Sequence, residues 1–150
     1  MLVYLEPVSK PRQTQADKWR KRPRVMRYRA FADKLRLLVG PVPQGAVALT
    51  LVFWIAAPAS RRKGKTRVWE DSPHLGKPDL DNLQKSLLDA LWDDDSRVWR
   101  VTAEKRWTLD RARISIEIDT QPLTPGDAVY TGTTENQRAR AAPLRDGASL

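Results

Sequence analysis

The sequence predicts a single α/β domain with about four strands and two main helices, and three observations support this prediction. Residues 46–57 are apolar, β-branched and aromatic, which is typical of a strand. Two segments, one beginning near Tyr28 and one over 82–92, repeat apolar residues at helical spacing. Two more strand-like segments follow residue 98. A chain of 150 residues is long enough for one domain with a real core and short for two.

The N-terminal part is expected to form a short strand and a basic loop or arm. Residues 2–5 are apolar, and Pro7 and Pro11 then end the strand because proline cannot continue a hydrogen-bonded ladder. Residues 8–24 are polar and basic, with Trp19 among them. This composition predicts a loop or arm.

The first predicted helix begins near Tyr28 and ends at Gly40, which is followed by proline. Its apolar face consists of Tyr28, Phe31, Leu35 and Leu38. The strand over 46–57 follows, and because its apolar residues lie on both faces we expect a central strand covered from both sides. A connection over 58–78, rich in Arg, Lys, Gly and Pro, comes next; its length indicates a functional loop.

The second helix is predicted over residues 82–92. Its buried stripe consists of Leu80, Leu83, Leu87, Leu88 and Leu91. Residues 98–107 and 112–118 read as strands that could pair as a hairpin. From residue 120 the chain has few large apolar residues, so 120–150 is expected to be a flexible tail that adds little to the core.

The charge balance favours a polyanionic partner. The chain has 27 Lys and Arg against 18 Asp and Glu, and the positive charge is concentrated in residues 1–40 and 61–67. Nucleic acid is the first expected partner and an anionic membrane surface the second. No apolar run approaches the ~20 residues that span a bilayer, so we expect a soluble, intracellular protein.

The composition also excludes several kinds of site. The absence of cysteine rules out disulfides and zinc-finger ligand sets. His74 is the single histidine, which removes most Ser/His and two-His metal schemes. Its expected role is that of an ordinary polar loop residue.

An acidic constellation stands out against this basic background. Asp79 and Asp81 precede or begin the second helix, and residues 93–95 are three aspartates at its exit. Asp81 with Gln84 fits a capping box, which explains one aspartate. The triplet lies where the helix dipole disfavours negative charge. Asp79 and Asp81 would point to the same side if the chain is still extended there. A site for Mg²⁺ or Mn²⁺ and a solvated acidic surface both remain open.

Lys85 has two interpretations as well. It lies four positions after Asp81, on the same face of the helix. It could form a surface ion pair with Asp89, which would contribute a few tenths of a kcal/mol. Alternatively, its ammonium could face a scissile phosphate and stabilise the charge that develops there.

The run KPDLDNLQKSLLDAL over 77–91, followed by DDSRV over 94–98, resembles the RusA-type Holliday junction resolvases of bacteria and their phages. The resemblance covers about residues 2–119 and leaves the tail unmatched. It implies a RusA-like domain over 1–119, built on a small mixed β-sheet, and an irregular, flexible tail over 120–150.

Carried over by this resemblance, the metal-binding aspartates are Asp79, Asp81 and Asp95, with Lys85 as the essential lysine. Asp94 is the neighbouring acidic residue of the pair and a further candidate ligand. The segment between the helix and this pair is shorter than in many members, so Asp93, Asp94 and Asp95 all remain candidates for the third ligand. The implied cofactor is Mg²⁺, with Mn²⁺ as a possible substitute.

The resemblance implies an endodeoxyribonuclease that resolves four-way junctions by paired symmetric nicks in DNA recombination and repair. The expected assembly is a homodimer in the cytoplasm of a bacterial cell or phage-infected host. The alternatives are a nuclease for flaps or other branched nucleic acid, and a non-catalytic basic DNA-binding protein. The basic arm and loop predict these DNA contacts: Lys10, Arg12, Lys18, Arg20, Lys21, Arg22, Arg61, Arg62, Lys63, Lys65 and Lys77.

Overall fold

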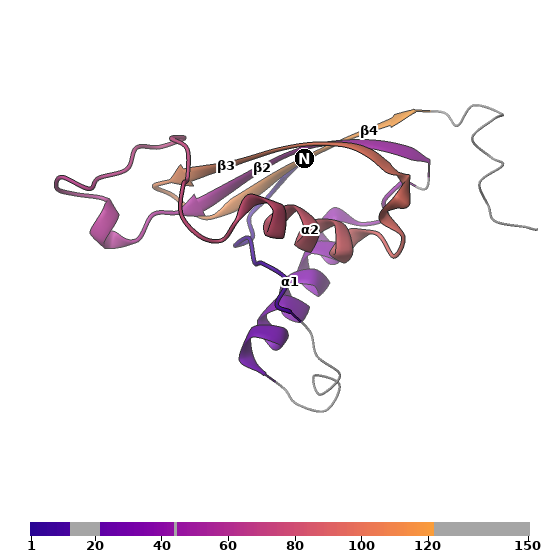
Figure 1. The fold of residues 1–150 in the computed structure, drawn as a ribbon, viewed down its shortest axis with the longest axis horizontal. Helices are drawn as coiled ribbons and strands as arrows, with labels where there is room; N and C mark the ends of the chain where they lie inside the picture. The colour runs from indigo at the N-terminus through magenta and orange to yellow at the C-terminus, as the bar shows by residue number, and fades with distance from the viewer. Residues whose placement is uncertain (13–21, 44, 122–150) are drawn as a thin grey trace, which may run out of the picture.

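The computed structural model describes residues 1–12, 22–43 and 45–121 and shows a four-stranded mixed sheet with two main helices (Figure 1). This confirms the predicted fold class. The elements in chain order are β1 Leu2–Val3, α1 Pro23–Val39, β2 Ala46–Ala56, α2 Leu80–Leu91, β3 Val98–Thr108 and β4 Arg113–Gln121, with short 3-10 turns at Ala59–Arg61 (η2) and Asp95–Arg97 (η3).

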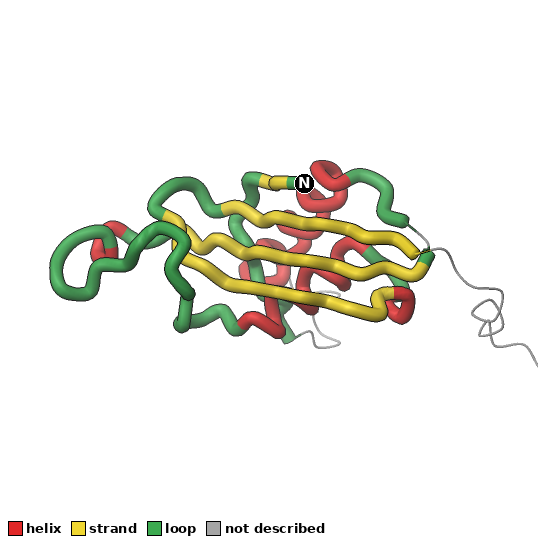
Figure 2. The backbone as a smooth tube through the Cα atoms, turned by 90° about the horizontal axis from the view of Figure 1, so that it is seen from above, coloured by secondary structure: helices red, strands yellow, loops and turns green. Residues whose placement is uncertain are grey.

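The strands lie in the order β1-β4-β2-β3, with β2 parallel to β3 and antiparallel to β4 (Figure 2). The predicted hairpin between the last two strands is therefore wrong, because β2 lies between them. β2 is the most apolar strand, and Leu49, Leu51 and Phe53 are each at most 1% exposed. A central place buries these side chains and pairs both edges of the strand with neighbours.

Both helices cover the same face of the sheet (Figure 1). Ile114 and Ile116 of β4 join the apolar side chains of β2 on this covered face. On the other face Thr50 of β2 and Glu117 of β4 are paired and exposed. The prediction that β2 is covered from both sides is thus wrong for the part of the chain that the structure describes. The reason is that polar side chains of β4 lie beside β2 on the second face, which stays exposed to solvent.

Helix α1 begins at Pro23, five residues before the predicted start, because Val25 extends the apolar series by one turn. Proline suits this first position because its missing N–H would have no partner there. The helix ends at Gly40, as predicted, where φ is +75°. Leu38, predicted to be in the core, is 44% exposed.

Helix α2 begins at Leu80, earlier than predicted, with Asp79 as its N-cap residue. Asp81 therefore lies in the first turn, and the predicted capping role for Asp81 is wrong. Leu83 and Leu87 pack under the sheet and are at most 1% exposed. Ser86 is also buried, and its hydroxyl donates to the carbonyl of Val8 at 2.5 Å. This bond holds the N-terminal segment against α2.

The connection over 57–79 projects beyond one end of the sheet (Figures 1 and 2). Its returning branch pairs with the outer edge of β3. The amide of Asp71 donates to the carbonyl of Trp107 at 2.9 Å, and the amide of Trp107 donates to the carbonyl of Ser72 at 2.8 Å. The returning branch is thereby fixed to the sheet just before α2 begins.

No helix in the described ranges is both long and apolar enough to cross a bilayer. Thr120 and Gln121, placed in the tail by the sequence, belong to β4. The rest of the predicted tail, 122–150, and Trp19 lie outside the described residues. The predicted strand over 2–5 is shorter than expected, since only Leu2 and Val3 pair with β4.

We expect Leu87→Ala to lower the free energy of unfolding by about 2–5 kcal/mol, because a fully buried leucine leaves a cavity when it is truncated. Leu37→Ala is the matched control, since Leu37 is also helical but 83% exposed. Urea denaturation of both variants measures the difference. Equal, small losses would contradict the packing described for α2.

Candidate active site

Asp79 and Asp81 lie at the beginning of α2. Asp79 has extended backbone, with φ −71° and ψ 147°, and Asp81 follows in the first helical turn. Both side chains are exposed, and neither carboxylate has a hydrogen bond or ion pair with a described residue. Mg²⁺ is commonly held by one or two carboxylates together with waters and substrate phosphate. These two carboxylates fit that mode.

Lys85 is exposed and lies one turn after Asp81 on the same side of α2. The predicted alternative, an ion pair with Asp89, does not form, because Asp89 pairs with Lys10 at 2.8 Å. Lys85 makes no ion pair or hydrogen bond among the described residues. Its ammonium is therefore available to a ligand. It lines a recess of about 310 Å³ together with Lys10, Pro11, Arg12 and Asn82.

The N-terminal segment reaches this recess because α1 and α2 hold it. The hydroxyl of Tyr28 in α1 lies 3.5 Å from the carbonyl of Ser86 in α2. The hydroxyl of Ser86 in turn donates to the carbonyl of Val8 in the N-terminal segment. The Lys10 ammonium lies 5.9 Å from the centre of the Tyr28 ring. Burial raises the pKa of Tyr28, and the nearby positive charge of Lys10 opposes this effect. Lys10 is thus placed along α2, where it pairs with Asp89 and lines the recess with Asn82 and Lys85.

The third predicted carboxylate is not brought to this site. Residues 93–95 follow the far end of α2, and twelve helical residues at 1.5 Å each separate the two ends by about 18 Å. Asp94 accepts a hydrogen bond from the amide of Ser96 at 3.0 Å, and this bond lowers the pKa of Asp94. No group of three or more acidic or histidine side chains within 1–12, 22–43 and 45–121 is placed to hold a metal. Asp79, Asp81 and Lys85 thus lie within the first turns of α2, and Asp94 and Asp95 lie beyond its other end.

Lys105 was missed by the sequence reading. Its ammonium donates to the carbonyls of Gly76 and Pro78, at 2.6 and 2.5 Å, directly before Asp79. The available signal was its place in β3. It follows Val101 and Ala103 on the strand's core-facing side, where a lysine is unusual unless it has partners.

The family model for Endodeoxyribonuclease RusA matches residues 5–119. The chain belongs to this family. The resemblance found in residues 77–91 and 94–98 is confirmed, and both segments lie within the match. RusA endodeoxyribonucleases are nucleases that act at Holliday junctions, a form of branched DNA. A search of the curated proteins gave no match.

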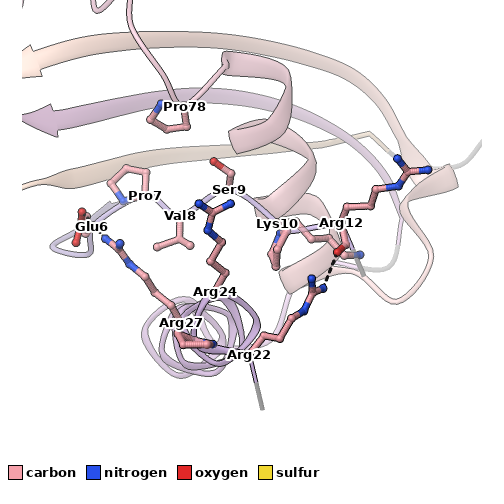
Figure 3. Close-up of a pocket in the computed structure, with 12 residues that line it drawn as sticks. Glu6, Pro7, Val8, Ser9, Lys10, Arg12, Arg22, Arg24, Arg27 and Pro78 are labelled. Carbon is pink, nitrogen blue, oxygen red and sulfur yellow. Dashed lines mark hydrogen bonds and ion pairs between the residues drawn. The ribbon is translucent and has the colours of Figure 1, made fainter. Parts of the chain in front are cut away.

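A second, larger recess of this RusA family member is strongly basic. It has a volume of about 900 Å³ and lies between the N-terminal segment and the start of α1 (Figure 3). Arg22, Arg24 and Arg27 project toward the segment, and Arg27 pairs with Glu6 at 2.7 Å. The lining cations are Lys10, Arg12, Arg22, Arg24 and Arg27.

Three of these cations, Lys10, Arg12 and Arg22, are predicted DNA contacts. Arg24 and Arg27 were expected only as part of a basic arm over 8–29 that contacts phosphates, and the structure places them in α1. The predicted contacts Lys18, Arg20 and Lys21 lie outside the described residues.

The remaining predicted DNA contacts lie on the connection over 57–79. Arg61, Arg62, Lys63 and Lys65 are exposed on its projecting part, and Lys77 is exposed beside Asp79. Trp69 is 61% exposed, and the guanidinium of Arg67 lies 3.7 Å from the centre of its ring. The base of the connection is anchored at Asp71, which accepts a bond from the Trp54 indole at 2.9 Å and pairs with Arg106 at 2.9 Å. The sheet thus determines where the basic loop lies.

His74 lies in a loop, as predicted, but is only 5% exposed. Its ring centre is 4.0 Å from that of Trp107, and its Nδ1 has no hydrogen-bond partner among the described residues. Burial, followed by the positive charge of Lys105, lowers the pKa of His74 below its usual 6.5. The folded protein therefore favours the neutral imidazole.

This shift predicts that stability falls in mild acid. A base whose pKa is lower in the folded state contributes fully above its unfolded pKa, and the contribution is lost as the pH falls below about 6.5. We expect the difference in unfolding free energy between the wild type and His74→Gln to shrink between pH 8 and pH 5. Urea titrations across that pH range measure this difference. The titration of all other groups contributes equally to both proteins and cancels in the difference. A difference that stays constant would show that His74 does not titrate this way.

Proposed function

We propose that this protein is a divalent-metal-dependent endodeoxyribonuclease that resolves four-way DNA junctions by paired symmetric nicks in recombination and repair. One observation carries the proposal. In a chain of net charge +9, two carboxylates and one lysine that have no partner among the described residues lie in the first turns of α2, beside a cationic recess. Membership of the RusA family supports the same substrate class.

Asp79 and Asp81 would hold Mg²⁺, or Mn²⁺ in its place, through oxygen ligands. When bound, such an ion supplies an acidified water and neutralises charge on the phosphate. Lys85 would face the same phosphate and stabilise the negative charge that grows on its oxygens as water attacks phosphorus. Lys10 and Arg12, on the other side of the recess, would hold the neighbouring backbone phosphates in register.

The reaction needs no covalent intermediate with the protein. The chain has no cysteine, and its single histidine is buried against Trp107. Direct attack by water forms one P–O bond and breaks the bond to the leaving 3′ oxygen, which takes up a proton. The products are a 5′-phosphate and a 3′-hydroxyl.

A homodimer would reconcile the predicted third ligand with the observed separation. Asp94 and Asp95 lie about 18 Å along α2 from Asp79, too far to share an ion within one chain. A two-fold axis perpendicular to α2 would make the helices of two copies antiparallel, so the Asp94–Asp95 end of a second copy would meet the start of α2. The same symmetry presents two sites to the equivalent strands of a junction.

We expect Asp81→Asn to reduce Mg²⁺-dependent junction cleavage by about 10³-fold or more, because the variant loses a charged ligand at the reacting phosphate. Junction binding in Ca²⁺ should persist. Gel assays with four-way, flap and duplex substrates measure cleavage and its preference, and calorimetry measures divalent-ion binding.

Asp33→Asn is the control for this experiment, since Asp33 is an exposed aspartate on α1, away from the site. Full activity of Asp81→Asn would refute the site. Cleavage of flaps in preference to junctions would reassign the substrate. If the wild type binds DNA but neither binds divalent ions nor cleaves DNA, the protein is a non-catalytic DNA-binding protein.

Subunit mixing tests the shared site. Asp81→Asn and Asp95→Asn should each be inactive alone. Mixed dimers would regain one intact site, because one copy supplies Asp79 and Asp81 and the other supplies Asp95. We expect single nicks in the mixture and no paired cleavage. If the mixture stays as inactive as either variant, each site is made by one chain. Full activity of Asp95→Asn alone would show that Asp95 is no ligand.

A further inference from the structure

Lys105 lies on the core-facing side of β3, opposite Phe53 of β2. From there its side chain reaches the segment that leads into α2, where the ammonium donates to the carbonyls of Gly76 and Pro78 at 2.6 and 2.5 Å. Pro78 directly precedes Asp79. One ammonium therefore bonds two backbone positions within three residues of the candidate metal-binding carboxylate.

These two bonds connect the segment to the sheet. The segment begins at the amide of His74, which bonds the carbonyl of Lys105, and ends at the carbonyl of Asp79, which bonds the amide of Leu83. Between these points, the other backbone contact among the described residues is that of Gly76 with the His74 side chain, which lies against it. Leu75, Gly76 and Lys77 are exposed, so packing adds little restraint. The position of Asp79 depends on a cation anchored in the sheet.

The bonding of Lys105 also suits it to this task. Lysine has three donors and no acceptor, and both of its partners here are neutral carbonyls. Its positive charge is not cancelled by a carboxylate among the described residues. A merely structural salt bridge would have neutralised that charge. Here the charge stays beside the site, and two carbonyl oxygens of the segment before Asp79 accept hydrogen bonds from it.

We propose that Lys105 is a positioning residue of the nuclease site. By holding the Gly76 and Pro78 carbonyls, it sets the direction in which the Asp79 carboxylate leaves the chain and the point where α2 begins. This inference rests on the proposed function, since it concerns the same carboxylates. It adds a residue from β3, 24 positions after Asp81 in the sequence.

The test compares Lys105→Met, Lys105→Arg and the control Lys34→Met, which removes the same charge from an exposed position on α1. Partners that orient ligands typically change metal affinity or activity by about 10–100-fold when removed. For Lys105→Met we expect Mn²⁺ affinity, measured by calorimetry, and the kcat for junction cleavage to fall within that range. Junction affinity in Ca²⁺ should stay close to that of Lys34→Met. Lys105→Arg should recover part of both losses, because a guanidinium can also donate to two carbonyls.

Amide hydrogen exchange over residues 75–83 supplies a readout that does not depend on catalysis. We expect faster exchange in Lys105→Met at the amide of Leu83, which bonds the carbonyl of Asp79, with the later turns of α2 unchanged. Lys105→Gln replaces Lys105→Met if the latter does not fold. Unchanged exchange, Mn²⁺ affinity and kcat in a folded variant would overturn the proposal.

The two proposals fail in different ways. If the wild type neither cleaves junctions nor binds Mn²⁺, the proposed function is refuted, and a positioning role in catalysis is refuted with it. If the wild type cleaves and Asp81→Asn does not, while Lys105→Met behaves like Lys34→Met, the function stands and the role of Lys105 falls.

Discussion

The packing of α2 beneath the sheet is the constraint on which the rest of the structure depends. Leu83 and Leu87 are buried in the core between α1 and the sheet, so rotation of the helix would expose them. Its start is then fixed near the end of β3, where Lys105 bonds the residues before Asp79. Its exit is fixed about 18 Å away, where residues 93–95 turn into β3. Because burial fixes the helix in place, Asp79 and Asp81 at its start are held apart from residues 93–95 at its exit.

Local patterns in the sequence predicted elements well and their arrangement poorly. The spacing of apolar residues located both helices and the central strand, because the buried side of each element requires apolar residues at regular intervals in the sequence. It could not show that β2 lies between β3 and β4, since the choice between a hairpin and a crossover depends on which strand gains most from a central place. The early start of α1 was hidden by the arginines around Val25, which are polar in the sequence but project toward the N-terminal segment in space (Figure 3).

The candidate site shows the same division. Asp79, Asp81 and Lys85 could be grouped from the sequence because four residues make about one helical turn. Lys105 could not, because its contact with Pro78 spans 27 positions and depends on the register of β3. The ion pair of Asp89 with Lys10 could not be predicted for the same reason, because the two residues are 79 positions apart. Since Asp89 pairs with Lys10, it does not pair with Lys85. Contacts of this length follow from the finished fold.

The distribution of charge follows from this architecture. The N-terminal segment brings Lys10 and Arg12 to a recess that Asn82 and Lys85 of α2 also line, so basic groups lie near the turn of the helix that carries Asp81. Lys10 is paired with Asp89, which keeps that lysine from approaching the other two aspartates. A cation and a phosphate would need such an arrangement together, because carboxylates repel DNA unless an ion lies between them and basic groups flank it. The acidic pair is therefore compatible with a DNA surface only when a cation is shared between protein and phosphate.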